Sequence, residues 1–192
     1  MIEPVYEKGY PSFEAVNRQE RYHNYILRKT REDRKMIETW ETPYPKWHIR
    51  FLKIAKEIST WSKDPSSKIG AVIVNDDRRI LATGYNGFPR GIEDSDERLN
   101  DREEKYPRII HAELNALMNA LYNGVSVKDA TLYVYGLPIC SDCTKSVIQS
   151  GIKHVVLSPP ELAPEKWRES WSKVSEPMFK EAGIEITKIA FD

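Results

Sequence analysis

The amino-acid sequence predicts an α/β fold of three layers, in which a central sheet lies between helices. Apolar segments rich in Val, Ile and Ala alternate with helical segments through the second half of the chain. This alternation is typical of a sheet covered by helices on its faces. Two earlier apolar runs, 69–75 and 79–84, meet at the turn-forming residues Asn75, Asp76 and Asp77. They predict an antiparallel hairpin.

The composition is that of one globular domain with a small appendage. The chain has 192 residues, of which 40% are hydrophobic and 30% charged, enough to build one core. Its 29 basic residues equal its 29 acidic residues, so net charge predicts no nucleic-acid or membrane partner. No apolar run approaches the roughly 20 residues that span a bilayer, and the first residues lack a secretion signal. We therefore expect a cytoplasmic protein.

Residues 1–45 differ from the rest of the chain and are interpreted as a charged, proline-containing appendage. Residues 46–192 are then the main domain. Within the appendage, residues 18–35 hold seven basic residues against three acidic ones. This segment is either a solvated helical face or a surface that contacts a partner or a phosphate.

The elements of the main domain are predicted in order. A helix begins at Trp47, because apolar residues recur at spacings of three and four, and we expect its tryptophans to lie in the core. The stripe is Trp47, Phe51, Ile54, Ile58 and Trp61. After the hairpin come a glycine-rich loop, Gly84 to Gly91, and an acidic irregular stretch, 93–105. Helices are then expected at 112–122, 143–150 and about 164–182, and strands at 131–135, 154–158 and 184–190.

His111 and Glu113 stand in the first turn of the helix expected at 112–122, whose apolar stripe is Leu114, Leu117, Met118 and Leu121. Polar side chains at the start of a buried helix usually have a structural or functional role, and two interpretations are open. One reading is electrostatic, since Glu113 would interact favourably with the positive end of the helix dipole. The other is a functional site.

The chain contains only two cysteines, Cys140 and Cys143, which lie too close together to close a long loop. They stand one turn apart where a helix begins, and the unpaired amides there stabilise thiolate, the form that binds metal. A pair with this spacing is either a metal site or a redox pair of the thioredoxin type.

Together, His111, Cys140 and Cys143 supply three of the four tetrahedral positions that Zn²⁺ prefers. Three protein ligands and an open fourth position are typical of a catalytic zinc site, and Glu113 is placed to accept a proton from water there. The remaining histidines, His23, His48 and His154, do not suggest ligands, and His48 and His154 are interpreted as packing or surface residues. A noncatalytic zinc-binding module stays an alternative.

These motifs jointly resemble the deoxycytidylate deaminase family, within the cytidine deaminase-like superfamily. The resemblance runs from about Trp47 to the C-terminus and implies a central five-stranded mixed sheet between helices, with 46–192 as a zinc-dependent deaminase domain. In one place the chain departs from the family, because Ile139 stands between Pro138 and Cys140 where proline normally precedes the first cysteine. The segments that carry the resemblance are Asp64-Pro65-Ser66-Ser67-Lys68-Ile69-Gly70-Ala71, Gly84-Tyr85-Asn86-Gly87, His111-Ala112-Glu113-Leu114-Asn115-Ala116 and Gln149-Ser150-Gly151-Ile152-Lys153.

The resemblance implies hydrolytic deamination of deoxycytidine monophosphate (dCMP) to deoxyuridine monophosphate (dUMP), with release of ammonia, for thymidylate supply. Glu113 would be the catalytic proton carrier. Asn86, Ser67 and Lys68 would lie near the substrate. Arg168 is a candidate contact for the substrate phosphate, with an ordinary exposed helix arginine as the alternative. A deaminase of the same fold acting on nucleic acid also stays open, on the basic segment 18–35.

The resemblance further implies allosteric regulation within a hexamer, with dCTP as activator and dTTP as inhibitor. Mg²⁺ would accompany the regulatory triphosphate, and the planar guanidinium of Arg90 suits phosphate oxygens. The alternatives are a solvated arginine and a loop that only reverses the chain. The residues expected at this site are Gly84, Tyr85, Asn86, Gly87, Arg90 and Gly91.

Overall fold

The computed structural model describes residues 45–190. Of the appendage expected over 1–45, only Pro45 falls within this range, so His23 and the basic segment 18–35 lie outside the described residues. Among the residues that are described, no helix combines the length and the apolar character needed to cross a membrane.

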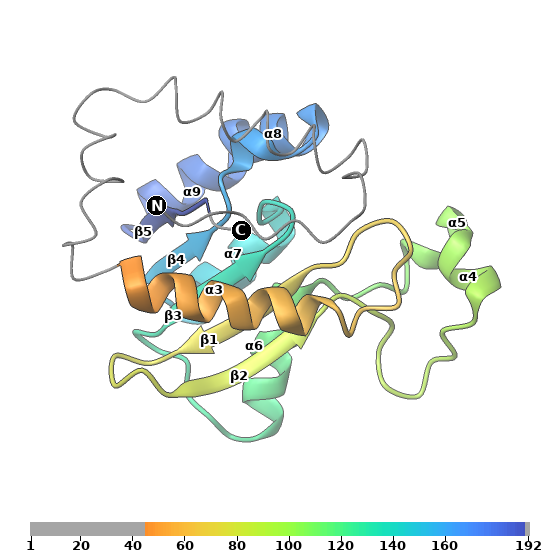
Figure 1. Cartoon of the computed structure of the whole chain (residues 1–192), viewed down its shortest axis with the longest axis horizontal. Helices are drawn as coiled ribbons and strands as arrows, with labels where there is room; N and C mark the ends of the chain where they lie inside the picture. Colours follow the sequence, from red (N-terminus) through yellow and green to blue (C-terminus); the bar gives the residue numbers. More distant parts are fainter. Residues whose placement is uncertain (1–44, 191–192) are drawn as a thin grey trace, which may run out of the picture. The chain divides into compact units, whose positions relative to one another are not determined.

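Helices and strands follow one another in the order that the sequence predicts, with additions described below (Figure 1). The strands are β1 (Gly70–Val74), β2 (Ile80–Tyr85), β3 (Thr131–Tyr135), β4 (His154–Leu157) and β5 (Glu185–Lys188). The helices are α3 (Pro45–Ser59), α4 (Asp96–Asn100), α5 (Arg102–Lys105), α6 (Ala112–Tyr122), α7 (Ser141–Gln149), α8 (Glu165–Ser170) and α9 (Glu176–Glu181). A 3₁₀ turn covers Pro160–Leu162, and a π-helical turn, Trp171–Ser175, joins α8 to α9.

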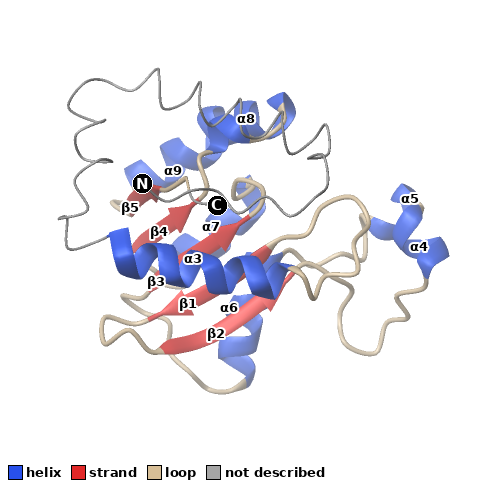
Figure 2. Cartoon of the chain, in the orientation of Figure 1, coloured by secondary structure: helices blue, strands red, loops and turns tan. Residues whose placement is uncertain are grey.

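The five strands form one mixed sheet in the order β2-β1-β3-β4-β5 (Figure 2). Strand β1 is antiparallel to both β2 and β3, whereas β3, β4 and β5 run parallel. The hairpin at 69–84 and the five-stranded mixed sheet are therefore confirmed. Strands β3, β4 and β5 are parallel because a helical crossover follows β3 and another follows β4. Each crossover returns the chain to the end of the sheet at which the previous strand began.

The sheet divides the core into two halves because successive side chains point to opposite faces. On one face, Phe51, Leu52 and Ala55 of α3 pack against Val72 and Tyr133. On the other face, α6, α7 and α9 pack against the alternate residues of β1, β3 and β4. The three-layer arrangement is thus confirmed: α3, the sheet, and the helices that carry the chemistry-bearing residues.

The predicted apolar stripe of α6 is only partly buried, and this part of the prediction is wrong. Leu117 is buried, but Met118 and Leu121 are 42% and 70% exposed. The face toward the sheet is instead built from small residues: Ala112, Ala116 and Ala120. A Cβ at Gly84 would collide with the backbone of Ala112 and Ala116. Helix α6 therefore lies too close to β2 for large side chains to fit between them.

Three further expectations need correction. Trp61 is 57% exposed because α3 ends at Ser59, two residues before it. The stretch 93–105 is not irregular but contains α4 and α5, the second capped by Asp101, whose side chain accepts from the N–H of Glu103. The single helix expected at 164–182 is interrupted by the π-helical turn that joins α8 to α9.

His48 and His154 are packing residues, as the sequence suggests. The ring of His48 lies edge-on to that of His154, with centroids 5.4 Å apart, and His48 Nδ1 is 3.0 Å from the hydroxyl of Tyr133. Burial lowers the pKa of His48, and the nearby His154 lowers it further against the pull of Glu185. The pKa of His154 is also lowered, again chiefly by burial.

We predict that acid destabilises the fold through this histidine pair. Both rings are neutral in the folded state and have a pKa below their ordinary value of 6.5, so the unfolded chain binds more protons as pH falls through that value. Urea unfolding measured from about pH 7.5 to about pH 5.5 should show falling stability. The fall should be shallower in His48→Gln. Parallel curves for the two proteins would contradict this role.

Candidate active site

The candidate site lies where two helices begin at the same end of the sheet. His111 occupies the N-cap position of α6 and Cys140 that of α7, which brings Cys143 into the first turn of α7. Strand pairing sets this meeting point, because Gly70 lies opposite both Tyr85 and Tyr135, the last residues of β2 and β3. The chain leaves β3 at this end and reaches Cys140 five residues later.

The three donor atoms lie at the separation that a shared zinc ion requires. His111 Nδ1 is 3.3 Å from Cys140 Sγ and 3.5 Å from Cys143 Sγ, and all three atoms lie within 4.8 Å of one another. Tetrahedral geometry with ordinary Zn–S and Zn–N bonds puts a sulfur and a nitrogen about 3.6 Å apart. Among the described residues, this is the one group of three or more such side chains placed to hold a metal.

The charges of the donors also suit a cation. Hydrogen bonding from Cys143, followed by that from His111, lowers the pKa of Cys140 to about 4. The same contact with Cys140, together with burial, raises the pKa of Cys143. The two thiols therefore cannot both ionise at this spacing, and a divalent cation between them would stabilise both as thiolates. The hydrogen bond to Cys140 raises the pKa of His111 to about 8, so a metal that binds His111 displaces a proton from it.

Glu113 lies buried beside the donors, with 3% of its surface exposed. Burial raises the pKa of its carboxyl to about 7, although its own backbone N–H and the nearby His111 act in the opposite direction. A carboxyl with this pKa can hold or release a proton near neutral pH. The electrostatic reading of Glu113 as a simple partner of the helix dipole does not account for so complete a burial.

The residue inserted before the first cysteine is part of the core. Ile139 is 1% exposed and belongs to the same apolar cluster as Cys143, and Pro138 is also buried. The backbone just before it turns at Gly136, whose φ is +117° and whose missing Cβ leaves room for Ile69 and Lys68. The cysteine loop therefore packs directly against the 64–69 turn.

Two of the predicted substrate residues, Ser67 and Lys68, lie at this end of the sheet. The side chain of the third, Asn86, forms hydrogen bonds within the protein. Ser67 is half-buried and Lys68 exposed in the turn beside Gly136. Asn86 is buried, and its side chain accepts from Ile69 N–H at 2.8 Å and donates to the Ser67 carbonyl at 2.8 Å. Its amide thus shapes the turn, and contact with a substrate stays a prediction.

Arg90, Gly91 and Arg168 lie on the surface, whereas Gly84 is buried and Tyr85 and Gly87 are half-buried. The guanidinium of Arg90 donates to Asn119 Oδ1 at 2.6 Å and lies 4.9 Å above the ring centroid of Tyr122 on α6. Gly91 is exposed with a φ of +81°, the left-handed conformation that favours glycine. Arg168 is exposed on α8. The substrate and regulatory roles of these residues stay predictions.

Sequence reasoning missed Lys105, a charged side chain that is 4% exposed and pairs with the buried Asp64. The capping signal of Asp101 before Glu103 could have located α5, but a lysine among many charged residues gives no sign of burial.

Comparisons with known proteins agree with this geometry. Residues 45–158 match the cytidine and deoxycytidylate deaminase zinc-binding region. The chain is 39% identical over 153 residues to deoxycytidylate deaminase of Mus musculus, covering 76% of this chain and 80% of that protein. It is 37% identical over 150 residues to an uncharacterized deaminase of the luxG 3' region of Aliivibrio fischeri, covering 77% and 96%. The structure of dCMP deaminase from cyanophage S-TIM5 in complex with dCMP and dUMP has a TM-score of 0.62 at 25% identity, covering 77% and 100%.

We predict that Cys143→Ser purifies with little zinc. A serine hydroxyl replaces a thiolate donor with a neutral and much weaker one, so two of the three protein ligands remain. Metal content measured by inductively coupled plasma mass spectrometry should fall well below that of the natural chain. Ser141→Ala, changed between the two cysteines, serves as the control and should keep its zinc. Equal zinc in both variants would show that Cys143 is not a ligand.

Proposed function

The chain belongs to the cytidine and deoxycytidylate deaminase family, and from this premise we propose that it hydrolyses dCMP to dUMP and ammonia, for thymidylate supply. The observation that carries the proposal is the buried Glu113 carboxyl beside the His111, Cys140 and Cys143 donors. The similarity to mouse deoxycytidylate deaminase over most of both chains supports a deoxynucleotide substrate.

His111, Cys140 and Cys143 would hold the metal, and their donor set and spacing fit Zn²⁺. When bound, zinc supplies Lewis acidity that makes water a nucleophile near neutral pH. The placement of all three donors at the beginnings of packed helices keeps them rigid, which favours one coordination geometry.

Glu113 would carry the protons of the reaction. Its carboxylate accepts a proton from the attacking water and delivers it to N3 of the cytosine ring, which makes C4 electrophilic. The second proton of the water then passes through the same carboxyl to the 4-amino group. The C4–N bond breaks, ammonia leaves, and the ring becomes uracil. A pKa of about 7 suits a group that must alternate between base and acid.

We propose that Ser67 and Lys68 face the nucleotide, because their turn packs against the cysteine loop at Gly136. Asn86 would act nearby, and the geometry supports a role in shaping the turn as much as a direct contact. Arg168, exposed on α8, is proposed as a contact for the substrate phosphate.

We further propose that nucleotides regulate the enzyme at a separate site. Binding of dCTP, with Mg²⁺, would activate the enzyme and dTTP would inhibit it, at the loop formed by Gly84, Tyr85, Asn86, Gly87, Arg90 and Gly91. The exposed apolar side chains of Met118, Leu121 and Tyr122 lie close together on α6, beside Arg90, and support self-association there, as in a hexamer. Rate curves for dCMP with and without saturating dTTP test the regulation.

We predict that the zinc-loaded chain releases ammonia from dCMP more efficiently than from deoxycytidine, guanine or adenine compounds, or single-stranded DNA. The substrate panel also tests the alternatives. A nucleic-acid deaminase would favour the DNA, with binding that weakens steeply as salt rises. A noncatalytic zinc module would release ammonia from none of them. Either outcome would refute the proposed substrate.

Glu113→Gln should keep zinc but lose about 10² to 10⁴ in turnover, the usual contribution of general acid and base catalysis. The amide has the same shape but cannot exchange protons. Zinc content and kcat measured on the same preparation separate this effect from loss of the metal. Glu97→Gln changes an exposed carboxylate on α4 and is the control. Near-normal turnover of Glu113→Gln would remove the proposed role.

A further inference from the structure

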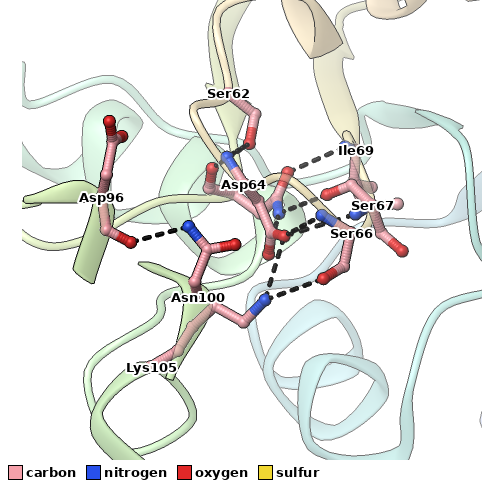
Figure 3. A network of polar contacts seen from close by, with 9 residues as sticks. Ser62, Asp64, Ser66, Ser67, Ile69, Asp96, Asn100 and Lys105 are labelled. Carbon is pink, nitrogen blue, oxygen red and sulfur yellow. Dashed lines mark hydrogen bonds and ion pairs between the residues drawn. The ribbon is translucent and has the colours of Figure 1, made fainter. Parts of the chain in front are cut away.

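A buried ion pair ties the segment before α6 to the turn that follows α3 (Figure 3). The ammonium of Lys105, at the end of α5, donates to Asp64 Oδ1 and to Ser66 Oγ, both at 3.1 Å. The side chains of Lys105 and Asp64 are 5% and 7% exposed. A pair so removed from water is little screened by salt, and either charge alone would be strongly disfavoured.

Asp64 is the centre of the polar network around this turn. Its Oδ1 accepts from the N–H groups of Ser66 at 2.8 Å and Ser67 at 3.3 Å, besides the bond from Lys105. Its Oδ2 lies 3.4 Å from the amide nitrogen of Asn86. Asn86 in turn binds Ile69 N–H and the Ser67 carbonyl. The turn from Ser66 to Ile69 is therefore held by side chains from two other segments.

The same network contacts the two segments that lead to the metal donors. The turn packs against Gly136, which begins the path to Cys140. On the other side, Gly87 and Ile110 exchange backbone hydrogen bonds of 3.1 and 2.8 Å, and Ile110 directly precedes His111. Lys105 is thus placed where a single charge can fix the turn relative to both donor-bearing segments.

We infer that Lys105 is a positioning residue, whose buried ammonium holds the turn from Ser66 to Ile69 in the place from which it meets the nucleotide. The inference rests on the proposed function for its effect on the substrate, but not for its effect on the turn. Lys105 itself is not proposed to touch the reacting atoms. It neutralises Asp64, so that the carboxylate can stay buried and hold the backbone of the turn.

A second ion pair between the same two parts of the chain provides a matched control. Lys63 Nζ lies 2.9 Å from Asp94 Oδ1, but the two side chains are 67% and 41% exposed. Exposed pairs of this kind contribute little because water screens them and the long side chains lose entropy. Lys63→Met therefore removes a lysine beside Asp64 without disturbing the buried network.

The direct test compares amide hydrogen exchange in full-length, zinc-loaded Lys105→Met, Lys63→Met and the natural chain. In Lys105→Met, exchange at Ser66 and Ser67 should quicken by about tenfold or more, since their acceptor Asp64 loses its compensating charge. Exchange at Ile69 should quicken as well, because its acceptor Asn86 is held by Asp64. Amides of β3 should keep their protection. Exchange in Lys63→Met should equal that of the natural chain. Unchanged protection of the turn in Lys105→Met would overturn the inference.

If Lys105→Met does not fold, Lys105→Gln provides the same test, because its neutral amide can still donate to Asp64. Circular dichroism and zinc content establish that the variant is folded and loaded. Faster exchange in the turn with β3 protected supports the inference, and equal exchange throughout overturns it.

Steady-state kinetics then test the consequence for the substrate. We expect KM for dCMP to rise about tenfold in the Lys105 variant while kcat changes less, because the turn would bind ground state and transition state alike. Mere loss of folded protein would lower apparent kcat and leave KM unchanged, and that result would overturn the positioning role. If the natural chain itself does not deaminate dCMP, the proposed function fails, while altered exchange still supports the role of Lys105 in the turn.

Discussion

The structure depends on one geometric constraint: three donor atoms from two helix starts must approach within a single coordination sphere. Helix α6 meets this constraint by lying unusually close to β2, with alanines on its inner face and Gly84 beneath it. Helix α7 meets it by beginning at Cys140, directly after the cysteine loop. The sheet fixes both starts, because β1 pairs on either side with β2 and β3.

The same packing explains the chemistry of the site. Close approach of α6 buries Glu113 completely, and burial is the main reason that its pKa rises toward neutrality. The start of α7 places the two thiols so near each other that they cannot both ionise without a cation. The two helix starts together therefore account for the metal affinity and for the raised pKa of the Glu113 carboxyl.

Much of this could be predicted from the sequence, since local signals and global fold agree. The strands, the hairpin turn and the starts of α6 and α7 follow from apolar periodicity and turn residues, and His111, Glu113, Cys140 and Cys143 follow from their spacing. The inner face of α6 could not be predicted, because apolar periodicity gives no measure of how close a helix lies to its sheet. The exposure of Met118 and Leu121 and the burial of Lys105 depend on such distances, which are set by residues far away in the sequence.

In the proposed site, one zinc ion is held by one nitrogen and two sulfurs, with its fourth position free for solvent. X-ray absorption at the zinc edge of the purified chain measures this coordination shell. Two sulfur neighbours are expected at about 2.3 Å, and one nitrogen and one oxygen at about 2.0 to 2.2 Å. Four protein ligands, or a coordination shell without sulfur, would contradict it.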